Sequence, residues 1–97
     1  MSYSIIIASP AKDELEESYN WYEMQKSGLG ERFIGIIERS ISLISNHPEF
    51  YPVKVGVYRQ YVVPKFPYVI VYELLPTENL IYILHIFNTN QHPDKKR

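Results

Sequence analysis

The sequence has no cysteine, which excludes disulfide bonds, thiolate chemistry and any zinc site ligated by cysteine. A domain of this size without disulfides is typical of a reducing compartment, so we predict a cytoplasmic protein. No segment approaches the ~18 consecutive apolar residues that a membrane-spanning helix requires. The short apolar run Ile5-Ile6-Ile7-Ala8 follows no basic residue, whereas a secretory signal begins with positive charge. We therefore expect no membrane partner.

Histidine and glycine are also sparse. The three histidines, His47, His85 and His92, fall in different predicted elements and lack the spacing of metal ligands. The segment Gly28-Leu29-Gly30 lacks the third glycine of a nucleotide-binding loop, and it follows a predicted helix where such a loop follows a strand. We therefore predict no metal and no cofactor.

One candidate acid–base pair, Glu73 with His85, can be tested geometrically, because such a pair can catalyse proton transfer. If Leu75 pairs with Leu80 across a hairpin, Glu73 lies opposite Tyr82. His85, three residues further, then points to the other face of the sheet. A register slip of one residue would reverse this result. We expect His85 to be a hydrogen-bonded sheet residue.

Net charge is small, at −1, but the two halves of the chain differ in sign. Residues 1–49 hold eight acidic and four basic residues, whereas residues 50–97 hold three acidic and six basic ones. Such polarity often marks an interaction surface. With no overall attraction for phosphate, any nucleic-acid binding has to be local. We assign the acidic run 13–17 to the solvated side of a helix.

The apolar pattern predicts one domain over residues 1–97, with a polar tail from residue 88. Strand residues 3–8 precede a helix that Ser9 caps and Pro10 begins, and a second helix follows near residues 30–45. Strands are predicted at 53–63, with a bulge at Gly56, at 68–75 and at 80–87. The order β-α-α-β-β-β predicts an α+β fold, with a helix hairpin packed on one face of a four-stranded, mainly antiparallel sheet. The other face stays open to a partner.

Tyrosine is abundant, with nine copies in 97 residues. Most of these rings are expected in the core, with the hydroxyl at its edge. Tyr58 and Tyr61 flank Arg59 on a less covered strand. Aromatic rings beside a cation can stack on RNA bases, bind a protein or blunt a sheet edge, and the sequence leaves these three open.

Several segments, in this order and spacing, resemble the RelE/ParE superfamily of bacterial toxins over nearly the whole chain. The segments are Trp21-Tyr22-Glu23, Gly28-Leu29-Gly30-Glu31-Arg32-Phe33, Phe66-Pro67-Tyr68 and Ile86-Phe87-Asn88-Thr89-Asn90. The resemblance implies the toxin of a type II toxin–antitoxin pair, of the kind associated with plasmid stabilization, which a small cognate antitoxin neutralises. It implies one of two activities. RelE-like members cut mRNA in the ribosomal A site, and ParE-like members poison DNA gyrase by binding it.

Metal-independent RNA cleavage needs cations and proton-transferring groups. If the chain is RelE-like, Arg59 matches the strand arginine of the family, with Lys54 and Lys65 as candidate helpers and His92 as a candidate replacement for the acid or base. The segment 88–93 departs from the RelE-like pattern, because asparagine and glutamine stand where many relatives carry histidine and arginine. We therefore expect His92→Ala to remain toxic and Arg59→Ala to weaken toxicity.

We interpret the chain as a ParE-like toxin that inhibits growth by binding a macromolecular target, with DNA gyrase the leading candidate and no enzymatic activity. The expected target or antitoxin contacts are Tyr58, Tyr61, Asn88 and Asn90. The first alternative is a RelE-like, metal-independent mRNA endoribonuclease acting on the ribosome. The second is a degenerate, non-toxic member that only binds its antitoxin. A homodimer and a heterotetramer with the antitoxin both remain open.

Overall fold

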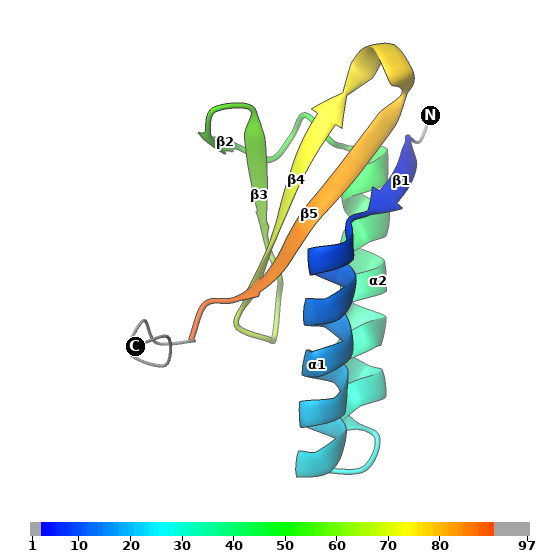
Figure 1. Cartoon of the computed structure of the whole chain (residues 1–97), viewed down its shortest axis with the longest axis vertical. Coiled ribbons are helices and arrows are strands. Elements are labelled where there is room, and N and C mark those ends of the chain that lie inside the picture. The colour runs from blue at the N-terminus through cyan, green and yellow to red at the C-terminus, as the bar shows by residue number, and fades with distance from the viewer. Residues whose placement is uncertain (1–2, 91–97) are drawn as a thin grey trace.

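The computed structural model of the chain describes residues 3–90. Within this range the chain forms two α-helices, five strands and one short 3-10 turn (Figure 1). The elements are β1 (Ser4–Ile7), α1 (Ser9–Gln25), α2 (Leu29–Asn46), β2 (Val53–Val55), β3 (Tyr58–Val62), β4 (Tyr68–Leu75), the 3-10 turn (Pro76–Glu78) and β5 (Leu80–Asn88). Among the described residues, neither helix is long and apolar enough to cross a membrane.

The strands form one sheet in the order β1-β5-β4-β3-β2, with the two helices side by side against one face (Figure 1). The predicted helix hairpin is confirmed, and β2 to β5 pair in antiparallel fashion. β1 pairs with β5 in parallel. The long apolar runs that form β4 and β5 lie at the centre of the sheet, as their composition predicts.

The prediction of four strands is wrong, because the segment 53–63 folds back on itself. Gly56 has a φ of +56°, a left-handed conformation that glycine adopts at little cost. It therefore makes a tight turn between β2 and β3 in place of the predicted bulge, and the sheet gains a fifth strand. The register shift in this pair lies between Val53 and Val55.

The two helices are joined by a short connection that Glu23 holds in place. Its carboxylate accepts hydrogen bonds from the backbone N–H groups of Gly28 and Gly30, both at 2.8 Å. These donors belong to the start of α2, where backbone N–H groups have no partner within the helix. Gly28 is left-handed, with a φ of +89°. Ser9, predicted to cap α1, is instead its first residue, and Ala8 precedes it without a side-chain cap.

The core lies between the helix hairpin and the sheet. Its centre is α2, whose buried side contributes Phe33, Ile37 and Ile44. Strands β4 and β5 contribute the facing layer, and a cluster of aromatic rings fills the end near the α1–α2 connection. This cluster comprises Tyr22, Phe33, Phe66 and Tyr68.

At Gly30 the two helices lie so close together that there is no room for a side chain. A Cβ atom placed on Gly30 would lie 2.7 Å from both the Tyr19 carbonyl oxygen and Glu23 Oε1, so a backbone atom would have to move. Gly30→Ala should therefore destabilise the protein by about 1–3 kcal/mol, the usual cost of overpacking. Gly35, in the same helix, has open space within 4 Å of the position that an added methyl group would take. Gly35→Ala should stabilise by about 0.5–1 kcal/mol.

Urea unfolding of the two variants and the parent protein measures both effects. Equal changes in the free energy of unfolding for Gly30→Ala and Gly35→Ala would show that the helices do not depend on this close approach.

Candidate functional site

The sheet face turned away from the helices, called here the open face, is largely apolar. Its members on β1, β3, β4 and β5 follow from the strand pairings: Ser4, Ile6, Tyr58, Gln60, Val62, Val69, Val71, Glu73, Leu75, Leu80, Tyr82, His85 and Phe87. Val62 is 74% exposed and Ile6 48%. This set holds one carboxylate and one histidine, and neither lysine nor arginine.

A bulge in β5 changes the face on which His85 lies. Leu75 pairs with Leu80 and Glu73 with Tyr82, as predicted, but the register shifts between Val71 and Tyr72. Tyr72 pairs with Ile83 and Val71 with His85, so Leu84 is the extra residue. The prediction that His85 and Glu73 point to opposite faces is therefore wrong. Both residues lie on the open face, because the extra residue in the bulge shifts the register by one and turns His85 to the side of Glu73.

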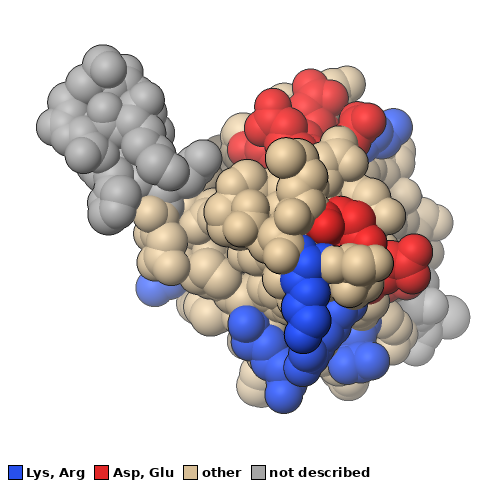
Figure 2. All heavy atoms as spheres, turned by 90° about the horizontal axis from the view of Figure 1, so that it is seen from below, with Lys and Arg blue, Asp and Glu red and all other residues tan. Residues whose placement is uncertain are grey.

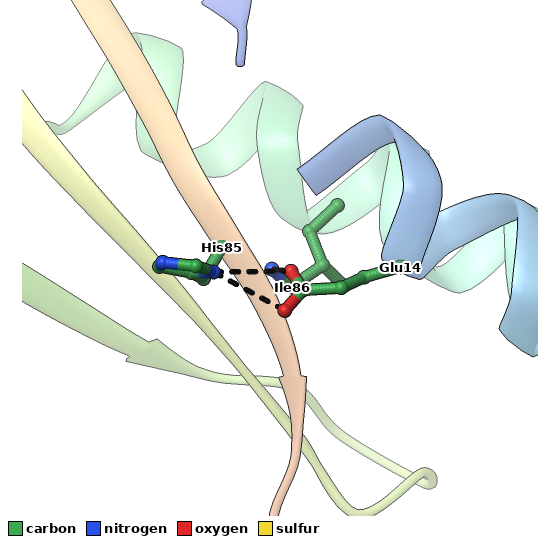
Figure 3. A network of polar contacts seen from close by, with 3 residues as sticks. All are labelled: Glu14, His85 and Ile86. Atoms are coloured by element: carbon green, nitrogen blue, oxygen red, sulfur yellow. Dashed lines mark hydrogen bonds and ion pairs between the residues drawn. The ribbon is translucent and has the colours of Figure 1, made fainter. Parts of the chain in front are cut away.

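Glu14 on α1 binds the strand just after this bulge (Figure 3). Its Oε1 accepts a hydrogen bond of 2.8 Å from the backbone N–H of Ile86. Its Oε2 lies 3.1 Å from Nδ1 of His85, which confirms His85 as a hydrogen-bonded sheet residue. The sequence assigns the whole acidic run to solvent. Glu14 departs from this assignment, because its side chain is only 32% exposed and its carboxylate is bonded to β5.

The position of Glu14 follows from the unequal lengths of two paired strands. β1 accompanies β5 only from Leu80 to Ile83, and the Ala8 N–H donates to the Ile83 carbonyl at 2.8 Å. The chain then enters α1, while β5 continues to Asn88. Along this remainder α1 lies beside β5 in place of a strand (Figure 1). A carboxylate one turn into α1 thus meets a backbone N–H that β1 no longer reaches.

A groove of about 440 Å³ separates α1 from the end of β5. Its α1 wall consists of Glu14, Glu17, Ser18, Trp21 and Tyr22, and its other wall of Pro67, Tyr68, Ile86, Phe87, Asn88 and Asn90. We call it the α1–β5 groove.

Within the groove the Tyr68 hydroxyl donates to Ser18 Oγ at 2.7 Å and accepts from Asn88 Nδ2 at 3.4 Å. Burial, and to a smaller extent the neighbouring Tyr68 hydroxyl, raises the pKa of Tyr22 to about 12. Tyr22 therefore remains neutral near pH 7, and the formal charges that the described residues bring to the groove are the carboxylates of Glu14 and Glu17.

The predicted cation Arg59 lies on the helix side of the sheet, opposite Tyr72. Its guanidinium donates to the carbonyl oxygens of Tyr51, at 2.6 Å, and Glu49, at 3.4 Å. Tyr72 holds the same loop, because its hydroxyl donates to the Pro48 carbonyl at 2.7 Å. Burial raises the pKa of Tyr72 to about 12, so this donor stays protonated. Arg59 is thus engaged in anchoring the loop between α2 and β2.

The other predicted site residues are spread over several places. Lys54 is exposed on β2, and Lys65 is exposed in the β3–β4 turn with a φ of +71°. His92 lies outside the described residues.

The expected contact residues also divide between surfaces. Tyr58 lies on the open face and is 39% exposed. Tyr61, three residues on, falls on the helix side, where it is buried against the ring of Tyr51. Asn88 and Asn90 line the α1–β5 groove. Sequence reasoning does not single out the groove residues Glu14, Glu17 and Trp21, although their spacing of three and four residues indicates one side of a helix.

The family model for the ParE toxin of the type II toxin–antitoxin system parDE matches residues 5–93. The chain belongs to the ParE toxin family. No curated protein matches it. Among solved structures, the chromosomal ParDE toxin–antitoxin system from P. aeruginosa is similar with a TM-score of 0.79 and 15% identity, covering 92% of this chain and 98% of that one.

RelE toxins share the same architecture. The isolated E. coli RelE toxin gives a TM-score of 0.66 at 9% identity, covering 98% of this chain and 93% of that one. The RelBE2 complex from M. tuberculosis gives 0.65 at 14% identity, covering 91% of this chain and 99% of that one. At these identities the likeness establishes the fold alone. The activity of this chain therefore depends on its own surface residues.

The contact between Glu14 and Ile86 gives a direct test of how α1 is fixed to the sheet. Glu14→Ala leaves the partly buried Ile86 N–H without its acceptor, and such a loss costs about 1–3 kcal/mol. Glu16, two residues further and exposed, serves as the control, and Glu16→Ala should change stability by no more than about 0.5 kcal/mol. Amide hydrogen exchange should accelerate at Ile86 in the first variant alone. Equal protection of Ile86 in both variants would contradict the assignment.

Proposed function

We propose that this ParE-family toxin inhibits growth by binding a macromolecular target, with DNA gyrase as the leading candidate, and that a cognate antitoxin neutralises it. The observation that supports binding over RNA cleavage is the makeup of the open face. It presents exposed Ile6, Tyr58, Val62 and Phe87, which are suited to contact with protein. It carries no lysine or arginine on β1, β3, β4 or β5, and a single cation, Lys54 of β2, lines a pocket with its residues Gln60 and Val62.

RNA cleavage makes the opposite demand on a surface. Bound phosphates and the charge that develops in the transition state both call for cations. Arg59, the strand cation that the resemblance nominates for this role, is directed at backbone carbonyls on the helix side. The surface thus favours a toxin that acts through protein contact.

An antitoxin segment is the natural cover for the open face. The similar P. aeruginosa and M. tuberculosis structures are described as a ParDE system and a RelBE2 toxin–antitoxin complex. In this chain the single helical layer leaves apolar side chains of β3 and β5 exposed, which favours a partner that contributes an amphipathic helix or an added strand. Covering these residues also removes a patch that otherwise promotes aggregation.

One contact keeps the ribosome-dependent mRNA endonuclease as a second candidate. His85 is half-exposed on the open face, and a carboxylate lies 3.1 Å from its Nδ1. A histidine oriented by a carboxylate is a common general acid or base. In that case His85, rather than the tail residue His92, would transfer the proton.

Expression of the toxin without antitoxin, at matched protein levels, separates the two functions. We expect inhibition of gyrase supercoiling and a DNA-damage response, with intact mRNA. His85→Ala removes one side chain of the open face, so toxicity should fall by much less than the roughly 10²–10⁴-fold that proton transfer is worth. Cleaved mRNA whose formation is lost in His85→Ala, while the variant stays folded, would establish the endonuclease in place of the proposed function.

The open face gives a separate prediction for antitoxin binding. Val62→Glu places a charge where the antitoxin is expected to bury an apolar surface, and it should weaken the complex about tenfold or more, since a buried unpaired charge costs over ~1.4 kcal/mol. Val57→Glu is the matched control, because Val57 is 58% exposed in the β2–β3 turn outside the open face. Calorimetric titration with the neighbouring antitoxin measures both. Equal affinities for the two variants would place the antitoxin elsewhere.

A further inference from the structure

One side of α1 presents two carboxylates and an indole ring to the α1–β5 groove. Glu14, Glu17 and Trp21 are separated by three and four residues, so they follow one another along the helix over two turns. All three line the groove. Phe87 lies on the opposite wall and also belongs to the open face, so the groove continues the surface proposed for the antitoxin.

The two carboxylates differ in their hydrogen-bond partners. Glu14 already accepts the Ile86 N–H and contacts His85. Glu17 is exposed, and within residues 3–90 its carboxylate has no hydrogen bond or ion pair. Trp21 is 57% exposed, although its ring packs edge-on against Tyr22 at 5.2 Å. The groove thus offers one uncommitted carboxylate next to one uncovered aromatic ring.

Charge complementarity identifies the occupant. Among residues 3–90, the lining of the groove includes two acidic residues and neither lysine nor arginine. On the face drawn in Figure 2, acidic side chains lie mainly at the top and right and basic ones mainly at the bottom, with some contact between the two. A carboxylate excludes phosphate, whereas an indole face and a carboxylate together attract a cation. The volume of about 440 Å³ falls within the range of ~300–1,000 Å³ that binding pockets occupy.

We propose that the α1–β5 groove binds an arginine or lysine side chain of the antitoxin, with the cation between the Glu17 carboxylate and the Trp21 ring. Arginine suits the site best, because its planar guanidinium can stack on the indole while it hydrogen-bonds to the carboxylate. On the facing wall, Asn90 supplies a side-chain amide for the backbone of the same segment, whereas the amide of Asn88 already bonds the Tyr68 hydroxyl and the Asn90 N–H. The identity of the occupant rests on the proposed function, whereas the chemistry of the groove does not.

Trp21 is the only tryptophan of the chain, so its fluorescence reports on this groove. The probe is acetyl-triarginine amide, with acetyl-tricitrulline amide as its neutral isostere. We expect a saturable change of Trp21 emission with triarginine and at least about tenfold weaker binding of tricitrulline, as charge-assisted hydrogen bonds are worth over ~1.4 kcal/mol. Glu17→Gln should weaken triarginine binding by a similar factor. Glu16→Gln, on the same helix outside the groove, should change it less than about twofold.

Equal weakening by Glu16→Gln and Glu17→Gln would overturn the site, because the peptide would then sense only the general charge of α1. The same fluorescence measurement also tests two other occupants of the groove. If removal of residues 91–97 alone shifts the Trp21 emission in the direction opposite to the peptide and tightens triarginine binding, the chain's own basic end fills the groove. If dilution of the protein alone gives this opposite shift, a second copy fills it. Either outcome overturns the antitoxin assignment.

The complete antitoxin then tests the source of the cation. Its affinity should fall about tenfold with Glu17→Gln and with Trp21→Leu, and stay unchanged with Glu16→Gln. If the antitoxin binds the parent and all three variants equally, this inference fails while the proposed function stands. If the antitoxin does not bind the parent protein, the neutralisation in the proposed function fails, and the triarginine titration still decides the chemistry of the groove.

Discussion

The hydrogen bond between Glu14 and the Ile86 N–H resolves a conflict between the lengths of two paired strands. β1 ends at Ile7, so β5 continues from its bulge to Asn88 without a strand on that side. A backbone N–H left there without an acceptor would cost free energy. Glu14 supplies the acceptor and so fixes the first turns of α1 alongside the strand. This attachment fixes where the first turns of α1 lie against β5, and Glu14 is therefore part of the groove wall.

Packing on the other side of the sheet determines which residues remain available. The helix hairpin, held by Glu23 and the absence of a side chain at Gly30, covers one face alone. Arg59 and Tyr72 extend from that covered face to the carbonyl groups of the loop between α2 and β2. The cation that the resemblance nominated for chemistry is thereby used to hold a loop. The open face keeps apolar side chains, and Glu14 of α1 lies at its border beside His85.

This distribution of charge and apolar surface explains why one fold can serve different toxins. The structure resembles ParDE and RelE proteins at identities of 9 to 15%, so the shared feature is the arrangement of helices and sheet. That arrangement depends on apolar residues spaced for the core, and many sequences satisfy it. The exposed side chains of the open face and the groove lie outside the core, so that spacing does not constrain them.

The sequence by itself determined the order of elements, the helix hairpin on one side of an open sheet and the central place of the runs 68–75 and 80–87. These depend on local properties, namely the spacing of apolar residues along a helix and the length of an apolar strand. The turn at Gly56, the parallel pairing of β1 and the bulge before His85 were decided by the tertiary structure. The turn depends on the pairing of β2 with β3, and the other two features depend on hydrogen bonds between segments that are further apart in the chain. The same holds for the groove, since Glu14 and Ile86 are 72 positions apart. No local pattern records that the helix replaces the strand at that edge.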